Sequence, residues 1–207
     1  MKPERSTNLN VSVGGDLANG RIKWETIAFA RDITDLIAFD GFDPATDQAL
    51  AENVPGKVRV RGGELVIDAE LLDVLSMKTS YTYSRAREMN DRQIDRVPEQ
   101  QAKLLVDYHS AGQRFGATLT LDYVGPVYQS VWDGPERFGN YVVVDLAGRV
   151  FLDSAHHHLI TARLENAFDR QYATSLGTTQ RDSDGSNYTY WNLGVPRTLE
   201  ARYNYRF

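Results

Sequence analysis

Apolar and polar residues alternate with a period of two along most of this chain, and helical periodicity is nearly absent. Because successive side chains of a β-strand point to opposite faces, each alternating run predicts a strand with one apolar and one polar face. The pattern predicts nine strands, over residues 7–17, 21–32, 57–70, 72–85, 101–109, 113–124, 140–152, 157–165 and 197–207. The chain is therefore expected to be all-β.

The last strand shows the alternation most strictly and ends on an aromatic residue. Its two faces carry Leu199, Ala201, Tyr203, Tyr205 and Phe207 on one side and Glu200, Arg202, Asn204 and Arg206 on the other. A strand of about membrane-spanning length that finishes on a C-terminal Phe is typical of the closing strand of an outer-membrane β-barrel. We therefore expect the apolar set to face lipid and the charged set to face the barrel interior.

One strand changes the parity of its polar positions. Arg59 and Arg61 are polar at odd positions, whereas the polar set from Glu64 onward is even. The change falls on Gly62 and Gly63, and an extra residue in one strand would produce it. The sequence therefore predicts a β-bulge at this glycine pair.

The connections between the predicted strands alternate in length. Short ones lie near 17–21, 70–73, 109–113 and 152–157, and long ones span about 32–57, 85–100, 125–139 and 165–196. Short periplasmic turns and long extracellular loops are the pattern of an up-and-down transmembrane barrel with antiparallel strands. In this orientation the final strand ends in the periplasm.

The strand count then indicates an incomplete barrel. Single-chain bacterial barrels have an even number of strands with both ends in the periplasm. An odd count places residues 1–6 on the extracellular side, and these residues contain no apolar segment of a signal peptide. We therefore expect residues 1–207 to be the C-terminal part of a longer barrel.

Composition narrows the function classes. The net charge of -5 and the absence of a Lys/Arg run argue against a nucleic-acid partner. The chain has no cysteine, which excludes disulfides and thiolate metal sites, and it has no run of about 18 apolar residues that could form a membrane helix. Its 11 Tyr and 8 Phe suit strands and the aromatic girdles of a barrel.

Several segments together resemble the TonB-dependent outer-membrane receptors. Glu165-Asn-Ala-Phe-Asp-Arg-Gln-Tyr172 is similar to their "N-L-F-D-x-x-Y" box, although Ala167 replaces the usual Leu. Val195-Pro-Arg-Thr198 with the alternating strand to Phe207 resembles their C-terminal ending. Other matches, in the family's order, are Lys2-Pro-Glu-Arg-Ser-Thr-Asn8, Asp32-Ile-Thr-Asp-Leu-Ile37 and Arg96-Val-Pro98.

The resemblance implies about nine strands of a 22-stranded barrel. It also implies a plug domain and the first barrel strands outside this chain. Such a receptor lies in the outer membrane of a Gram-negative bacterium, in contact with lipid. It takes up a scarce nutrient, such as an iron–siderophore, haem or cobalamin, driven by the TonB complex, and it is inserted by the barrel-assembly machinery. No cofactor and no enzymatic activity are implied.

The residues of the family boxes are expected to serve structure and assembly rather than ligand binding, because Asn and Asp satisfy backbone groups where a strand ends and the aromatic rings anchor near the wall. These residues are Asn166, Phe168, Asp169, Tyr172, Pro196, Arg197, Tyr205 and Phe207. Aromatic residues in or beside the long loops could stack on a ligand or belong to the outer aromatic girdle. These ligand candidates are Tyr128, Trp132, Tyr188, Tyr190 and Trp191.

Three other classes stay open at this point. A general porin would share the strand pattern, but the family boxes would then be coincidental. An outer-membrane hydrolase needs a Ser and a His on one face, and the adjacent His109 and Ser110 point to opposite faces. A soluble β-sandwich would cover its apolar face with a second sheet. The three consecutive histidines at 156–158 would diverge on a strand, so no metal site is expected.

Overall fold

Strands are the only regular elements in the part of the chain that the computed structural model describes, which is residues 1–43, 45–46, 48–53, 56–88 and 91–207. None of these residues belongs to a helix that is long and apolar enough to cross a membrane. The thirteen strands are β1 (Arg5–Leu17), β2 (Ile22–Thr34), β3 (Ile37–Asp43), β4 (Gln48–Asn53), β5 (Lys57–Leu72), β6 (Leu75–Arg87), β7 (Gln100–His109), β8 (Phe115–Val131), β9 (Gly134–Phe151), β10 (His158–Glu165), β11 (Ala173–Gln180), β12 (Asn187–Leu193) and β13 (Thr198–Tyr205).

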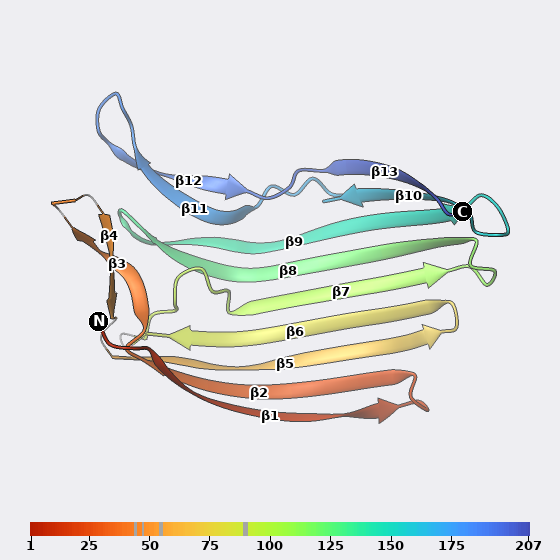
Figure 1. The fold of residues 1–207 in the computed structure, drawn as a ribbon, viewed down its shortest axis with the longest axis horizontal. Coiled ribbons are helices and arrows are strands. Elements are labelled where there is room, and N and C mark those ends of the chain that lie inside the picture. The colour runs from red at the N-terminus through yellow and green to blue at the C-terminus, as the bar shows by residue number, and fades with distance from the viewer. Residues whose placement is uncertain (44, 47, 54–55, 89–90) are drawn as a thin grey trace.

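Nine of these strands form one curved antiparallel sheet in the order β1-β2-β5-β6-β7-β8-β9-β10-β13 (Figure 1). They are the nine predicted strands, and each pairs with the next one in sequence except where a small hairpin intervenes. The hairpins β3–β4 and β11–β12 form separate two-stranded sheets. Within the described residues β1 and β13 are the edges of the sheet, so it is not closed. The predicted all-β fold with antiparallel, up-and-down strands is confirmed.

The register of the sheet separates an apolar face from a polar face. On the apolar face, Leu199 lies opposite Leu164, which lies opposite Leu146. The next strands continue this row with Leu119 and Val106. No second sheet covers this face among the described strands, which argues against a sandwich. Large apolar side chains therefore stay exposed on it from edge to edge, among them Leu9, Val11, Val13, Leu65, Tyr81, Tyr108, Val142, Ile160 and Tyr203.

The polar face is tied together by ion pairs between strands. Arg149 on β9 donates to both carboxylate oxygens of Asp107 on β7, at 2.8 and 2.9 Å, across the intervening β8. The hydroxyl of Thr118 on β8 donates to the same carboxylate at 2.6 Å. A bidentate contact of this kind fixes orientation as well as charge, and it holds three neighbouring strands in one register.

The alternation of short and long connections holds with one correction. Short turns join β1–β2, β5–β6, β7–β8 and β9–β10 at one end of the sheet (Figure 1). The long loop predicted over 125–139 is wrong, since β8 and β9 extend through it to a turn at residues 132–133. Gly125, Pro126 and Gly134 resemble loop residues in the sequence, but Val127 and Phe138 of this arm pack on Ala173 and Leu176 of β11. This packing stabilises the extended strands.

The bulge predicted at Gly62 and Gly63 is also wrong. Pairing of β5 with β2 and β6 runs without a shift through both glycines, and the irregularity lies at Glu70–Leu72 instead. Gly62 is required for a different reason, because a Cβ there would lie 2.5 Å from Cζ of Phe29. Since the alternation is unbroken, Arg59 and Arg61 share the face of Leu65 and lie at the end of the apolar band.

One side chain of β8 holds the β11–β12 hairpin against the nine-stranded sheet. The amide of Gln129 donates to the carbonyl of Leu176 at 2.7 Å and accepts from its backbone N–H at 3.1 Å. Gln129 is buried, with 5% of its surface exposed. Loss of both hydrogen bonds should make docking of the hairpin on the sheet less favourable by about 2 kcal/mol.

We expect Gln129→Ala to loosen this hairpin while the nine-stranded sheet stays folded. Amide hydrogen exchange at residues 173–180 should accelerate at least tenfold. Exchange in β9 from residue 147 onward, away from the hairpin, should not change. Gln101→Ala, at an exposed position on β7, is the matched control. Unchanged exchange in β11 would contradict the role assigned to Gln129.

Candidate functional site

The aromatic residues that the sequence singled out do not all come together. Tyr128 lies on β8 opposite Arg137 of β9, and Trp132 lies in the turn between these two strands with 55% of its surface exposed. Tyr188, Tyr190 and Trp191 lie on β12, and all three are exposed. The predicted set is thus divided between the β8–β9 arm and the β11–β12 hairpin.

The β12 tyrosines serve the hairpin itself. The Tyr188 and Tyr190 rings are 6.4 Å apart, and the guanidinium of Arg181 lies 5.4 Å from the centroid of the Tyr188 ring. The Tyr190 ring covers Gly177 on the paired strand. At the tip of the hairpin, hydrogen bonds from the hydroxyl and amide of Ser186 hold the pKa of Asp184 below its ordinary value. These contacts order a hairpin that projects from the wall.

Trp191, from the predicted set, lines a cavity. This cavity, of about 330 Å³, lies where β9 meets the chain between β10 and β11. It is lined by Arg137, Phe138, Gly139, Asn140, Tyr141, Arg170, Gln171, Tyr172, Ala173 and Trp191. We call the space that these residues enclose the β9–β11 cavity.

A pair of tyrosines whose rings are in contact forms one side of the β9–β11 cavity. The ring centroids of Tyr141 and Tyr172 are 4.3 Å apart with an interplanar angle of 39°. Gly139 and Asn140, just before Tyr141, have positive φ values of 75° and 55°. A Cβ at Gly139 would lie 2.6 Å from the carbonyl oxygen of Gly125, so the close approach of β8 requires glycine there. Gly139 and Asn140 both line the cavity where the backbone of β9 departs from the extended conformation.

The cavity combines the groups that recognise a flat anionic ligand. Aromatic faces contribute stacking area, and guanidinium groups bind carboxylate or other anionic oxygens with a fixed fork geometry. Arg137, Tyr141 and Arg170 were not singled out in the sequence, and Tyr172 was assigned to the family box alone. The sequence gives no sign that these residues form one site, because they come from segments about thirty residues apart that meet only in the folded structure.

Asn166 is the centre of the loop that follows β10. It is 2% exposed and adopts φ 47°. Its side-chain amide donates to the carbonyls of Arg170 at 2.9 Å and Val195 at 3.0 Å, and its side-chain oxygen accepts from the backbone N–H of Arg170 at 2.8 Å. Its own N–H donates to Asp145 at 2.9 Å. These four bonds join β9, the start of the loop and its end.

The other residues of the two family boxes lie around this centre. A carboxylate oxygen of Asp169, at φ 52°, accepts from the backbone N–H of Arg197 at 3.1 Å. The carbonyl of Pro196 accepts from the hydroxyl of Thr198 at 2.9 Å, and the Tyr172 carbonyl accepts from the N–H of Gly194. Phe168 differs, because 78% of its surface is exposed. The boxes thus bring residues 166–172 and 194–198 together at the N-terminal end of β13.

The aromatic end of the chain packs on β10. The Tyr205 ring lies 5.0 Å from that of Phe207 and 4.9 Å from that of His158. The hydroxyl of Tyr203 is 2.6 Å from Nδ1 of His158. Phe207 itself is fully exposed.

The three consecutive histidines contact different neighbours. His156 stacks on Phe151, Nδ1 of His157 lies 3.2 Å from Asp153, and His158 contacts Tyr203. Hydrogen bonds from the backbone amides of His158 and His157 lower the pKa of Asp153. In the described part of the chain no three His, Cys, Asp or Glu side chains gather as metal ligands would.

Comparison with known proteins gives a match to a family and to solved structures. The family model described as "TonB dependent receptor-like, beta-barrel" matches residues 1–167. No curated protein sequence matches the chain significantly.

Three solved structures illustrate the structural match. The pyoverdine outer membrane receptor FpvA from Pseudomonas aeruginosa PAO1, bound to pyoverdine, has a TM-score of 0.78 at 20% identity, over 100% of this chain and 30% of FpvA. The ferric yersiniabactin uptake receptor FyuA from Yersinia pestis has a TM-score of 0.78 at 19% identity, over 99% of this chain and 30% of FyuA. The copper transporter OprC has a TM-score of 0.75 at 18% identity, over 100% and 32%. The chain thus spans about a third or less of these proteins, and they support its fold.

Proposed function

Since the chain belongs to the family of TonB-dependent receptor-like β-barrels, we propose that it forms the C-terminal part of the wall of an outer-membrane receptor that takes up a small metal chelate. Family membership supports transport rather than catalysis, and it argues against a general porin or a barrel hydrolase. The open edges of β1 and β13 are the places where further barrel strands would pair.

The β9–β11 cavity is the observation that carries this proposal. It lies at the long-loop end of the sheet, which the barrel pattern assigns to the extracellular side. The tilted pair of Tyr141 and Tyr172, with Trp191, offers ring faces to an aromatic or conjugated chelating group. Arg137 and Arg170 supply positive charge for the anionic oxygens of the chelate. At about 330 Å³ the cavity is at the small end of ligand sites, so we infer that it holds one chelating arm of a larger ligand.

Iron–siderophore complexes fit this chemistry best among the nutrient classes that the sequence left open. Ferric chelates present planar, oxygen-rich, anionic groups, whereas haem and corrin rings need a wider apolar slot. Of the three solved structures described above, two are named for siderophores and one for copper. We further propose that a plug domain, the TonB complex and the barrel-assembly machinery are partners of the full-length protein, and that Phe207 serves the last of these.

Chelate binding to the purified full-length receptor tests the proposal. Ferric catecholate, ferric hydroxamate and mixed-ligand ferric siderophores, with Cu²⁺ as a further probe, would be titrated while tryptophan fluorescence is followed. We expect saturable binding of at least one ferric chelate. Tyr141→Ala should weaken it about tenfold, which is the loss of a central aromatic contact.

Trp132→Ala is the matched control, because this exposed aromatic lies outside the cavity in the β8–β9 turn. It should change the dissociation constant less than twofold. Equal losses in the two variants would show that the β9–β11 cavity is not the contact surface. Absence of saturable binding by every chelate would contradict the proposed substrate class.

A further inference from the structure

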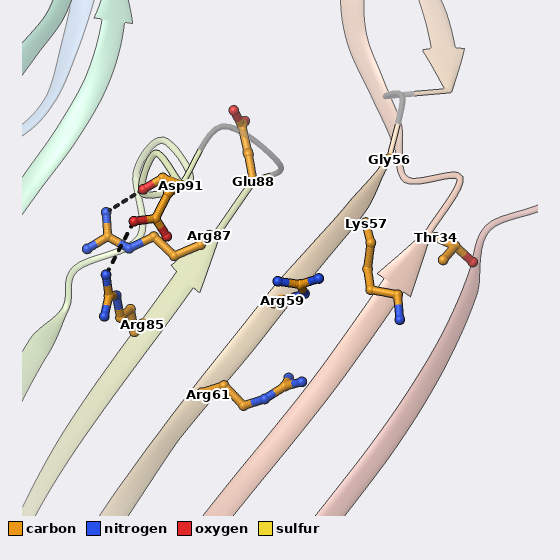
Figure 2. A pocket seen from close by; sticks show the side chains of 9 residues that line it. All are labelled: Thr34, Gly56, Lys57, Arg59, Arg61, Arg85, Arg87, Glu88 and Asp91. Atoms are coloured by element: carbon orange, nitrogen blue, oxygen red, sulfur yellow. Dashed lines mark hydrogen bonds and ion pairs between the residues drawn. The ribbon is translucent and has the colours of Figure 1, made fainter.

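Five cations gather at the long-loop end of β5 and β6. Lys57, Arg59 and Arg61 come from β5, and Arg85 and Arg87 come from β6 (Figure 2). With Thr34, Gly56, Glu88 and Asp91 they line a groove of about 520 Å³. We call these five side chains the β5–β6 cation cluster.

The β5–β6 cation cluster lies on the apolar face of the sheet. The pairing of β5 with β6 is unbroken from Arg59–Arg87 through Arg61–Arg85 and Gly63–Tyr83 to Leu65–Tyr81. Side chains two residues apart on a strand share a face, so the cations continue the row that contains both tyrosines. At about 3.4 Å per residue, Arg85 stands about 7 Å beyond Tyr83 along the strand.

The order of apolar, aromatic and cationic residues along β6 matches the layers of a membrane surface. Met77 and Tyr81 lie within the apolar band, Tyr83 is exposed at its edge, and Arg85 follows. In transmembrane barrels a girdle of aromatic side chains marks the interface, and anionic headgroups lie just outside it. The cluster therefore stands at headgroup height on the lipid side of the wall.

The cluster has more positive charge than its neighbours neutralise. Asp32 contacts Lys57 at 3.0 Å and Arg61 at 2.6 Å, and Glu99 contacts Arg87 at 2.6 Å. The contact of Arg85 with Asp91 is long, at 3.5 Å. The guanidinium of Arg59 makes no hydrogen bond or ion pair with any residue that the structure describes, although its backbone pairs with β2 and β6.

The cross-strand pairing also sets like charges against each other. Arg59 lies directly opposite Arg87, and Arg61 directly opposite Arg85. Like charges at such positions destabilise a sheet. An anion bound between the two strands would relieve this repulsion, and guanidinium forks bind phosphate oxygens in a bidentate manner.

We propose that the β5–β6 cation cluster binds the phosphate groups of a phosphorylated lipid in the outer leaflet. The inference rests on the outer-membrane placement in the proposed function, but not on the identity of the transported chelate. Arg59 and Arg85, which have the most unused donor capacity, contact the phosphate directly. Lys57, Arg61 and Arg87 keep their carboxylate partners and add to the positive potential. The lipid would seal the wall where the apolar band ends.

Lipid binding by the full-length receptor in detergent tests this site. The probes are diphosphorylated lipid A, the same lipid with both phosphates removed, and inorganic phosphate. We expect the wild-type receptor to retain the diphosphorylated lipid at least tenfold more tightly than the dephosphorylated one, as measured by native mass spectrometry and by titration. The double variant Arg59→Gln with Arg85→Gln should lose this preference, and salt should weaken the binding of the wild type.

Arg202→Gln, which removes an exposed arginine from the polar face of β13, is the matched control and should leave lipid binding unchanged. Chelate binding by the double variant shows that it is folded and separates this proposal from the previous one. Equal retention by wild type and double variant, or equal retention of the two lipids, would overturn the site. Inorganic phosphate that binds as tightly as the lipid would overturn the assignment to a lipid.

Discussion

Replacement of Asn166 by alanine should destabilise the full-length receptor by about 3 kcal/mol. The substitution removes three hydrogen bonds from a side chain that is 2% exposed, and it leaves two carbonyls and one N–H without their partner. It also places alanine at φ 47°, which costs about 1 kcal/mol of that total. Urea unfolding in micelles, followed by heat-modifiable gel mobility, would measure the loss.

A second variant separates the two causes. Asn166→Gly tolerates the positive φ but still lacks the amide, so it should be more stable than Asn166→Ala by about 1 kcal/mol. Asn204→Ala, on the polar face of β13 where the side chain is exposed, is the control and should change stability by less than about 0.5 kcal/mol. If Asn166→Ala behaved like Asn204→Ala, the loop would not depend on this amide.

Leu119→Arg is expected to impair insertion and stability more than any substitution on the opposite face. Leu119 lies in the middle of the apolar row, opposite Val106 and Leu146. An arginine at the midplane on the lipid face of a barrel costs about 2–4 kcal/mol. The amount of folded receptor in outer-membrane fractions and its unfolding free energy are the measurements.

The neighbouring residue provides the control for this prediction. Thr120 lies on the polar face of the same strand, opposite Asp145. Thr120→Arg introduces the same side chain at the same depth, next to a carboxylate, and should be tolerated. Similar defects in the two variants would mean that the apolar face does not meet lipid.

The nine-stranded sheet follows from the sequence because its information is local. A strand of period two assigns each residue to a face, and a short turn obliges consecutive strands to pair. The row that joins Leu164 to Leu146 is thus implied by alternation and turn length alone, whereas Leu199 joins it across the long connection that contains β11 and β12. The same reasoning misplaced the bulge at Gly62 and Gly63, because a change of polarity along one face looks the same in sequence as a change of face.

The extended strands were harder to predict. Gly125, Pro126 and Gly134 interrupt the alternation, and sequence rules assign such residues to loops. In the structure the β8–β9 arm continues through them, because Val127 and Phe138 gain burial against β11 and Gln129 binds the Leu176 backbone. A contact between residues about fifty positions apart has no local signature.

The sequence by itself determined which side chains lie on each face of the nine-stranded sheet, except at Arg59 and Arg61, how many strands this sheet has and which family the chain resembles. Only the tertiary structure brought Arg137 and Tyr141 next to Arg170, Tyr172 and Trp191, and placed arginine opposite arginine on β5 and β6. Alternation depends only on neighbouring residues and can therefore be read directly from the sequence. The cavity and the cation cluster depend instead on strand register and loop packing, which are settled when distant segments bury their surfaces against each other.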